Sequence, residues 1–417
     1  MRILYYCPDR GIPVLGDKGA SVHVRSFVTA LAHLGHEVVL ICTRLGAGNR
    51  RPPVSIVELA PPDGDDALRP VCDTLGIGHD ALVDPGLRGE LRKLAHDAQL
   101  PLLVRRAIAK LGFHPDLLYE RHALFHVSGI EIARQLGIAR VLEVNAPLVD
   151  EQARFRTLTL RPQAEARESA SLRGASLVVA VSQEVRGFAL ARGVPPGRVI
   201  VAQNGVDCVR FRHTVSGDAV RQRAGFASDP VIGFVGSFKP WHGVDVLLSA
   251  FARIARIRPQ ARLLAVGDGP MLAAARHRVH TEGLAGRVTL TGKVAHDEVP
   301  AHLAAMDFTV APYMPQDDFY FSPLKVVESL ASGRPVVAPK LGQLALLIAD
   351  GETGLLYPPG DLEALVGCLL RLLDDAALRH RLGAAGALQA QRCWNWSAVA
   401  ARIIAGIPAA PPRRGLA

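Results

Sequence analysis

Short apolar runs alternate with helical stretches along the first half of this 417-residue chain, and this alternation constrains the fold more than any other feature. Such runs are typical of strands that are buried on both faces of a parallel sheet. The stretch from Ala20 to Leu34 has helical spacing and stops at Gly35, which predicts a β-α-β start. We expect strands at residues 2–6, 38–42, 54–59, 116–119, 140–144, 176–181 and 198–202, a loop rich in Pro, Asp and Gly at 60–86, and a long helix at 89–111.

A second alternation of the same kind begins at Val231, after a polar and irregular stretch at 208–229. Right-handed crossovers between parallel strands would give a second doubly wound sheet. A chain of this length exceeds one ordinary core, so two domains are expected. The expected strands are 231–235, 262–266, 288–291, 308–311, 336–338 and 354–357. We predict an α/β protein with Rossmann-like domains at 1–208 and 209–390, followed by a terminal helix and a disordered basic tail at 391–417.

The stretch from Phe321 to Pro335 carries the start and stop signals of a short helix. Ser322 is a residue type that caps helices, and Pro323 fits the position just inside the first turn. Gly333 is typical of the residue that follows the last turn. Helical spacing places one apolar arc opposite a polar arc, so one face should be buried and the other should face outward.

This helix follows the expected strand at 308–311, so its N-terminus should open at the carboxyl edge of the sheet, where α/β proteins bind ligands. Free N–H groups, the positive end of the helix dipole and Lys325 would form an anion site, most simply for a phosphate. Glu328 lies one turn further on and could accept hydrogen bonds from sugar hydroxyls. The alternative is a routine core helix on which Lys325 and Glu328 pair at the surface.

Polar residues also follow the expected strands of the first half. Glu120-Arg121-His122 come after one strand and Asn145 to Glu151 after another, so they should project into one cleft at the carboxyl edge. Gly16 and Gly19 do not fit the dinucleotide pattern G-x-G-x-x-G, although backbone near Gly19 and Ala20 could approach a ligand. A lone His122 or Glu151 is more often a cap or a surface partner than a catalytic group.

The net charge of +9 does not indicate nucleic acid, because the basic residues are dispersed and are not interleaved with aromatic residues. Only seven of the 48 basic residues are lysines, and four of them fall at expected strand ends of the second half, where a point charge could face a phosphate. These four are Lys239, Lys293, Lys325 and Lys340.

The six scattered cysteines show no spacing typical of a disulfide framework or a zinc site. Asp63-Gly-Asp65 has the D-x-D pattern of a metal-holding loop, but an acidic Gly-rich turn explains it as well. The chain shows neither a secretory signal nor a spanning segment, so we expect a cytoplasmic protein with no transmembrane span, and peripheral contact with the inner face of the membrane is an option.

An ordered set of motifs narrows the family. It consists of Gly35-His-Glu-Val38, Asn204-Gly-Val-Asp207, Val235-Gly236 with the loop to Gly243, Val266-Gly-Asp-Gly-Pro270 and Glu328-Ser-Leu-Ala-Ser-Gly-Arg-Pro-Val336. In this order the chain resembles the GT4 family of retaining, nucleotide-sugar-dependent glycosyltransferases. The resemblance implies the GT-B fold, in which two Rossmann-like domains face each other across a cleft and the C-terminal helix returns to the N-terminal domain.

The resemblance also implies a donor site on the second domain. Glu328 would hold the ribose hydroxyls, and the segment at Val294 would meet the base. Cations in the loop after Gly236 would neutralise the diphosphate, but Ser237 stands where an Arg is usual and His242 where a Lys is usual, so Lys239 would take over part of that charge. Tyr320 stands at a position where members of the family often have a Glu that binds hydroxyls of the donor sugar. Amides of Phe321, Ser322, Pro323, Leu324 and Lys325 would meet the phosphates and the sugar.

We therefore expect a metal-independent hexosyltransferase that uses a UDP-, GDP-, ADP- or dTDP-sugar, needs no cofactor and acts on a hydroxyl of a glycan, a lipid-linked sugar or a small metabolite. Polysaccharide biosynthesis is one setting for such an enzyme. Lys239, Lys325, Glu328 and Asn145 would carry catalysis, with Gly19, Ala20, Arg121 and Glu151 on the acceptor side. Two alternatives stay open: a non-catalytic protein that binds a nucleotide sugar, and a GT-B nucleotide-sugar epimerase.

Overall fold

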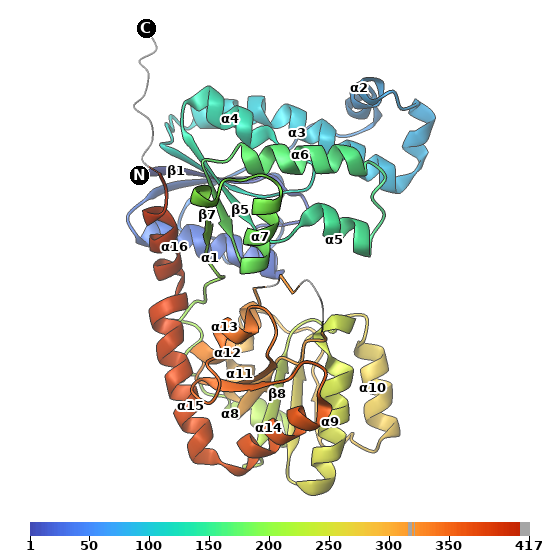
Figure 1. Cartoon of the computed structure of the whole chain (residues 1–417), viewed down its shortest axis with the longest axis vertical. Helices are drawn as coiled ribbons and strands as arrows, with labels where there is room; N and C mark the ends of the chain where they lie inside the picture. The colour runs from blue at the N-terminus through green and yellow to red at the C-terminus, as the bar shows by residue number, and fades with distance from the viewer. Residues whose placement is uncertain (316–318, 321, 409–417) are drawn as a thin grey trace. The chain divides into compact units, whose positions relative to one another are not determined.

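The computed structural model describes residues 1–315, 319–320 and 322–408 (Figure 1). By its internal contacts the chain divides into two compact units. The first contains Met1–Gln203, Tyr320, Ser322 and the C-terminal helix from Val399 onward. The second contains Asn204–Phe319 and Pro323–Ala398.

The first unit is built on a parallel sheet of seven strands in the order β3-β2-β1-β4-β5-β6-β7. The strand order reverses beside β1, which is the pattern of a doubly wound fold. The strands are β1 (Arg2–Cys7), β2 (Glu37–Cys42), β3 (Ser55–Glu58), β4 (Leu117–Arg121), β5 (Ala139–Val144), β6 (Leu177–Ala180) and β7 (Val199–Val201).

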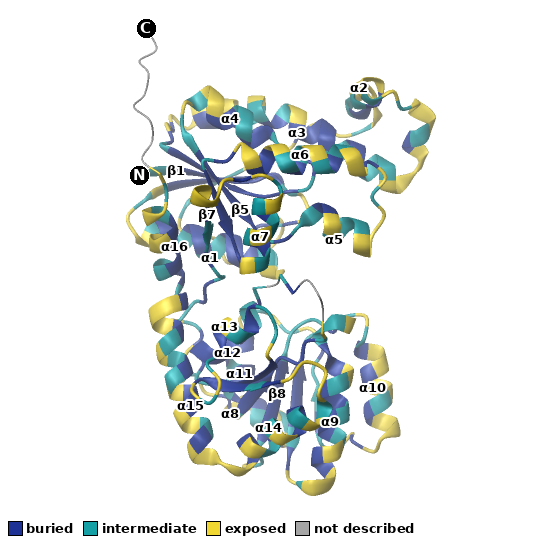
Figure 2. Ribbon diagram, in the orientation of Figure 1, coloured by how far each residue is buried: buried dark blue, intermediate teal, exposed yellow. Residues whose placement is uncertain are grey.

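Helices cover both faces of this sheet. Leu4 and Tyr6 of β1 belong to a core with residues of α3 and α4, while Tyr5, on the other face, contacts Phe27 of α1. Figure 2 shows the central strands buried and the helices exposed along their outer sides. The helices are α1 (Gly19–His33), α2 (Asp65–Leu75), a 3-10 turn (His79–Val83), α3 (Pro85–Lys110), α4 (Ser128–Leu136), α5 (Leu148–Phe155), α6 (Arg161–Arg173), α7 (Gln183–Ala191) and a 3-10 turn (Pro196–Arg198).

The second unit has a parallel sheet of six strands in the order β10-β9-β8-β11-β12-β13. The strand order reverses at β8, so ligand-binding loops are expected after β8 and β11. The strands are β8 (Val231–Val235), β9 (Arg262–Val266), β10 (Val288–Leu290), β11 (Phe308–Val310), β12 (Val336–Pro339) and β13 (Gly354–Tyr357).

One face of this second sheet packs against the main core of the unit, to which α9, α10, α14 and α15 contribute. Its helices are α8 (Asp218–Ala224), a 3-10 turn (Pro240–His242), α9 (Val244–Ile257), α10 (Leu272–Thr281), α11 (Val299–Ala304), α12 (Leu324–Ala331), α13 (Leu344–Leu347), α14 (Leu362–Asp374) and α15 (Ala376–Gln389). A π-helical turn at Ala390–Trp394 leads into α16 (Trp396–Ala405).

Several local predictions are wrong. The loop expected at 60–86 contains α2 and a 3-10 turn, and the irregular stretch at 208–229 contains α8. Ser322 does not cap α12, because Pro323 holds the N-cap position and no side chain accepts a capping hydrogen bond. The end of α12 is as predicted, since Gly333 adopts a left-handed φ of +68° directly after it.

Glu120 and Arg121 were expected after a strand, but β4 continues to Arg121 and both residues are buried within it. Glu120 does not project into a cleft, because its carboxylate is paired with the guanidinium of Arg140 at 2.5 Å and both side chains are 1% exposed. The longer strand was not visible in the sequence because charged residues rarely occupy the buried centre of a sheet unless they are paired.

Candidate active site

The loop after β8 wraps closely around the start of α12. Gly236 has a φ of +148°, which side-chain-bearing residues rarely adopt, and a Cβ atom there would lie 3.2 Å from the Nζ of Lys325. Gly243 closes the loop with a φ of +66°, and a Cβ atom there would lie 1.8 Å from the carbonyl oxygen of Pro312. Glycine at these two positions lets the loop lie against the strand end and the lysine.

Lys325 lies in the first turn of α12, and its ammonium nitrogen is buried. The Nζ lies 4.7 Å from the ring centroid of Phe234 and 4.4 Å from that of Tyr313. Among the described residues Nζ has no hydrogen-bond partner. Burial therefore lowers the pKa of Lys325 from 10.5 to about 7. A buried amine between two aromatic rings, without an acceptor, is suited to receive an anionic ligand.

His242 lies beside this lysine. Its Nδ1 lies 2.5 Å from the carbonyl oxygen of Ser237, and a carbonyl can only accept, so Nδ1 carries the proton. Burial, together with the charges of Lys325 and Lys239, lowers the pKa of His242 to about 3. His242 is therefore neutral at pH 7. Lys239, which lies in the same loop after β8, is exposed, and its Nζ lies 4.8 Å from the ring centroid of Trp241.

Glu328 lies on the second turn of α12 and is buried. Its Oε1 accepts a hydrogen bond from the Nε2 of His296 at 3.1 Å. The half-buried Val294 precedes His296 in the loop after β10. The family resemblance implied that Glu328 and Val294 belong to one site, and His296, which contacts Glu328, lies two residues after Val294. His296 itself was not predicted, because a lone histidine in a polar loop does not indicate a functional site.

The N-terminus of α12 begins with Pro323 and Leu324. The N–H of Val326 donates to the carbonyl oxygen of Pro323 at 3.1 Å, so the N–H groups of Leu324 and Lys325, which precede it, are the ones that this turn could offer to a ligand. Phe321 lies outside the described residues, and Ser322 contributes no cap. Gly236, Lys325 and the start of α12 are thus brought together at the carboxyl ends of β8 and β11.

In the first unit, a buried carboxylate that the sequence did not single out gathers two of the predicted residues. The Oε1 of Glu143 accepts hydrogen bonds from Arg121 and from Asn145, each at 2.6 Å. Its Oε2 lies 3.0 Å from the Nε2 of His23 and 2.9 Å from the hydroxyl of Tyr119. We call Glu143 and these four residues the Glu143 cluster.

The pKa of Glu143 is set by opposing effects. Desolvation raises it, but the attraction and hydrogen bonds of His23, Arg121 and Asn145 outweigh desolvation and lower the pKa to about 2. Glu143 lies on β5 and reads in the sequence as one more strand residue, so only the pairing of strands reveals its partners.

The remaining predicted residues lie around this cluster or apart from it. Gly19 and Ala20 form the first turn of α1, the helix that carries His23 one turn later. Glu151 lies on α5 and accepts a hydrogen bond from the hydroxyl of Tyr320 at 2.8 Å, within the first unit. Tyr320 packs against the core formed around β5, β6 and α7 of the first unit.

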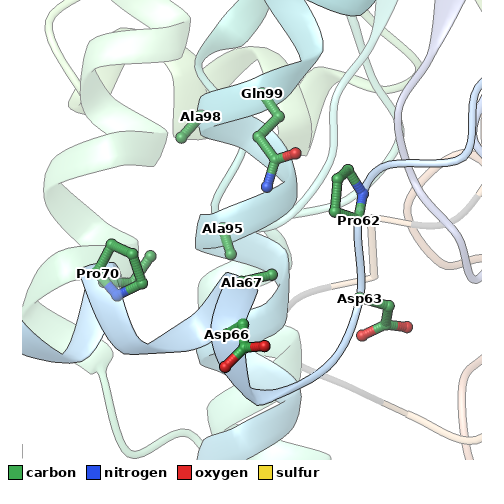
Figure 3. Close-up of a pocket in the computed structure, with 9 residues that line it drawn as sticks. Pro62, Asp63, Asp66, Ala67, Pro70, Ala95, Ala98 and Gln99 are labelled. Carbon is green, nitrogen blue, oxygen red and sulfur yellow. The ribbon is translucent and has the colours of Figure 1, made fainter.

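A separate surface groove of about 490 Å³ lies between α2 and α3 of the first unit. Figure 3 shows its lining from the loop at Pro62 and Asp63 and from the two helices. Asp63 is ion-paired with Arg10 and Arg92, and Asp65 with Arg88. None of the lining residues belongs to the Glu143 cluster. Within the described residues, no group of three or more metal-ligating side chains is found, and no helix is long and apolar enough to cross a bilayer.

Comparison with known protein families gives two matches. Residues 18–210 match the family described as Glycosyltransferase Family 4, and residues 229–375 match the one described as Glycosyl transferases group 1. The two segments fall on either side of the polar stretch at 208–229 and together cover most of the chain.

Curated relatives point the same way. A GDP-mannose-dependent alpha-(1-6)-phosphatidylinositol monomannoside mannosyltransferase of Mycobacterium tuberculosis is 32% identical over 235 residues, which are 55% of this chain and 61% of the relative. The chain thus aligns with about three-fifths of that protein's length. An alpha-D-kanosaminyltransferase of Streptomyces kanamyceticus is 29% identical over 39% of this chain and 41% of its own length. A glycogen synthase of M. tuberculosis is 26% identical over 96% of this chain and 92% of its own length.

Solved structures share the fold over almost the whole chain. Sucrose-phosphate synthase from Thermosynechococcus elongatus has a TM-score of 0.70 at 23% identity and covers 97% of this chain and 98% of its own. Anabaena Alr3699/HepE, solved in complex with UDP and glucose, has a TM-score of 0.69 at 19% identity with the same coverage. At these identities the likeness shows the fold alone, and the fold is GT-B.

Proposed function

This chain belongs to glycosyltransferase family 4, and from that premise we propose that it transfers a hexosyl group from a nucleoside-diphosphate sugar to a hydroxyl, with retention of the anomeric configuration. The observation that carries the proposal is the buried amine of Lys325, which has no hydrogen-bond partner in the described part of the chain, at the N-terminus of α12 and beside the glycine turn after β8.

The difficult step is departure of the nucleoside diphosphate, because negative charge develops on its leaving oxygen. The N–H groups at the start of α12 and the Nζ of Lys325 converge at one strand edge, where an oxygen anion would meet preformed donors. Each such donor contributes on the order of 3 kcal/mol to the barrier when it is well placed. We assign the same role to Lys239, whose side chain reaches solvent and can move to the ligand.

We assign His242 a different role from that of the Lys that is usual at its position. Because the Nδ1–H of His242 donates to the carbonyl oxygen of Ser237, Nε2 keeps its lone pair and can accept a hydrogen bond from a sugar hydroxyl. Ser237 therefore acts through its carbonyl, which holds the ring. We propose that the neutral ring of His242, held in this way, accepts a hydrogen bond from a hydroxyl of the donor sugar.

Glu328 is proposed to bind the ribose hydroxyls and the segment at Val294 the base. A carboxylate fixed on a helix accepts two hydrogen bonds from a cis-diol without reorganising. The donor nucleotide, among those of uracil, guanine, adenine and thymine, and the hexose stay open, because Tyr320 stands where members of the family frequently have a Glu that binds the sugar.

The acceptor side is assigned to the first unit. Arg121 and Asn145 are held by one oxygen of Glu143, so their remaining donors have fixed directions. Gly19 and Ala20, at the start of α1, offer backbone N–H groups, and Glu151 offers a carboxylate. The relatives include a phosphatidylinositol monomannoside mannosyltransferase and a glycogen synthase, so we propose two acceptor classes, a lipid-linked acceptor with peripheral membrane contact and a glycan.

The experiment is incubation of the purified chain with UDP-, GDP-, ADP- and dTDP-hexoses, with and without lipid and glycan acceptors. We expect release of one nucleoside diphosphate and transfer of the hexose with its anomeric configuration kept. Tight binding of a nucleotide sugar without turnover would instead indicate a non-catalytic binding protein. Conversion of the donor to an epimer would indicate an epimerase. Absence of any nucleotide binding would contradict the proposal.

A further inference from the structure

Glu328, the proposed ribose ligand, is not held by its own helix. Its side chain is 10% exposed, and its Oε1 meets the Nε2 of His296, which comes from the loop after β10. A glutamate side chain has three rotatable bonds, so this one contact decides where the carboxylate points.

The other nitrogen of the same imidazole is also engaged. The guanidinium of Arg210 reaches the Nδ1 of His296 at 3.1 Å and, through its second nitrogen, the backbone oxygen of His296 at 3.0 Å and the carboxylate of Asp297 at 3.2 Å. The ring of Phe211 lies 5.8 Å from that of His296 and 5.4 Å from the Arg210 guanidinium carbon. The imidazole is therefore enclosed by several contacts from one short segment.

These contacts fix the tautomer. A guanidinium has donors and no acceptor, so the Nδ1 that it approaches must present its lone pair. The proton of the neutral ring then lies on Nε2, and Nε2 donates to the Oε1 of Glu328. Arg210 thus determines that His296 is a donor toward the carboxylate rather than an acceptor that would repel it.

Arg210 itself is placed by a tight turn. The backbone N–H of Arg210 donates to the carbonyl oxygen of Asp207 at 3.1 Å and to its side chain at 3.2 Å, and the N–H of Val209 donates to the same carboxylate oxygen at 3.0 Å. A hydrogen-bonded chain consequently runs from Asp207 through Arg210 and His296 to Glu328, across three segments that are far apart in the sequence.

We propose that Arg210 and His296 are positioning residues that orient the Glu328 carboxylate for the two ribose hydroxyls of the donor nucleotide; this rests on the proposed function. With Oε1 held by His296, the carboxylate plane is set before the nucleotide arrives. The ribose hydroxyls then gain their hydrogen bonds without the cost of ordering a free side chain.

The test compares UDP and GDP with their 2′,3′-dideoxy counterparts by calorimetry on the full chain. His296→Leu should weaken binding of the better ribonucleotide about tenfold and leave its dideoxy counterpart unchanged, because the lost contact acts only through the ribose hydroxyls. His296→Gln, which keeps an N–H donor at similar reach, should restore most of the affinity. His302→Leu, which removes a buried histidine of the same unit, is the control and should change neither.

A spectroscopic arm tests the role of Arg210. Nitrogen-15 NMR of the ring nitrogens should show the Nε2-protonated tautomer of His296 in the wild type, and Arg210→Leu should weaken this preference, because the Glu328 carboxylate alone then favours it. Equal weakening of ribo- and dideoxynucleotide by His296→Leu, or no weakening of either, would overturn the positioning role while the proposed function stands. If the wild type does not distinguish ribose from dideoxyribose, the ribose assignment of Glu328 fails. If it binds neither UDP nor GDP, the comparison is repeated with ADP, and binding of none of the three would contradict the proposed function together with the positioning proposal.

Discussion

A Cβ atom on Gly236 would lie 3.2 Å from the Nζ and 3.3 Å from the Cδ of Lys325. The glycine turn after β8 and the lysine of α12 therefore share one space, and neither can change without affecting the other.

Gly236→Ala should reduce turnover about tenfold or more. The methyl group would displace the lysine, and a φ of +148° adds strain of about 1–3 kcal/mol. Steady-state kinetics and thermal unfolding measure the two effects. Gly283→Ala is the control for strain alone, because Gly283 has a φ of +68° and nothing lies within 4 Å of its added Cβ. Equal activity of the two variants would show that Gly236 does not contribute to the active site.

Lys325→Met should stabilise the fold while it impairs catalysis. Above pH 7 the folded state holds Lys325 neutral, whereas the unfolded chain keeps the amine protonated up to its ordinary pKa of 10.5. The unfolded state then binds more protons, so wild-type stability should rise with pH across this window. Below pH 7 the cost of the buried charge is fully present, at about 1.4 kcal/mol per unit of pKa shift.

Urea unfolding of wild type and Lys325→Met at pH 6 and pH 9 measures this effect. The variant should be more stable by about 2 kcal/mol or more at pH 6, and its advantage should shrink toward pH 10. A variant less stable than the wild type at both pH values would show that the amine has a partner that offsets its burial.

Binding of a nucleoside diphosphate should be accompanied by proton uptake. The pKa of Lys325 is lowered by burial, and the negative charge of a bound diphosphate would favour the protonated amine. Calorimetry at pH 8 in buffers of different ionisation enthalpy should show uptake of about one proton. The Lys325→Met variant should take up fewer protons than the wild type. Identical uptake by both proteins would show that a group other than Lys325 is protonated on binding.

Glu143→Gln should destabilise the first unit by about 3 kcal/mol, because it leaves Arg121 buried without its anion. The wild type should lose stability as the pH falls from 4.5 to about 2, since the unfolded carboxyl takes up a proton first. This acid dependence should weaken in the variant. Glu131→Gln is the control, because its exposed pair with Arg134 should contribute little. Acid titrations followed by circular dichroism compare the three proteins.

Turnover should be independent of added divalent metal. The D-x-D carboxylates are already paired with arginines, Asp63 with Arg10 and Arg92 and Asp65 with Arg88. Assays in EDTA, and of Asp63→Asn, should give wild-type rates. Inactivation by EDTA that Mg²⁺ or Mn²⁺ restores would assign a metal to the reaction.

The sequence by itself determined the two α/β alternations and nearly all strand positions, because buried parallel strands are apolar along their length and leave a signal at each run. It also located Lys325 and Glu328 on one short helix, since their spacing and the glycine stop are local properties. The helices at Asp65–Leu75 and Asp218–Ala224 were missed because turn residues such as Pro70 and Gly225 occur inside or next to them.

Only the tertiary structure decided what surrounds these residues. The rings of Phe234 and Tyr313 come from two different strand ends, and burial between them changes the chemistry of Lys325. His296 reaches Glu328 from a third segment. Contacts of this kind depend on which strands are neighbours in the sheet, and residue spacing along the chain carries no such information. The same reason hid Glu143, an ordinary strand residue until α1 and β4 bring its partners to it.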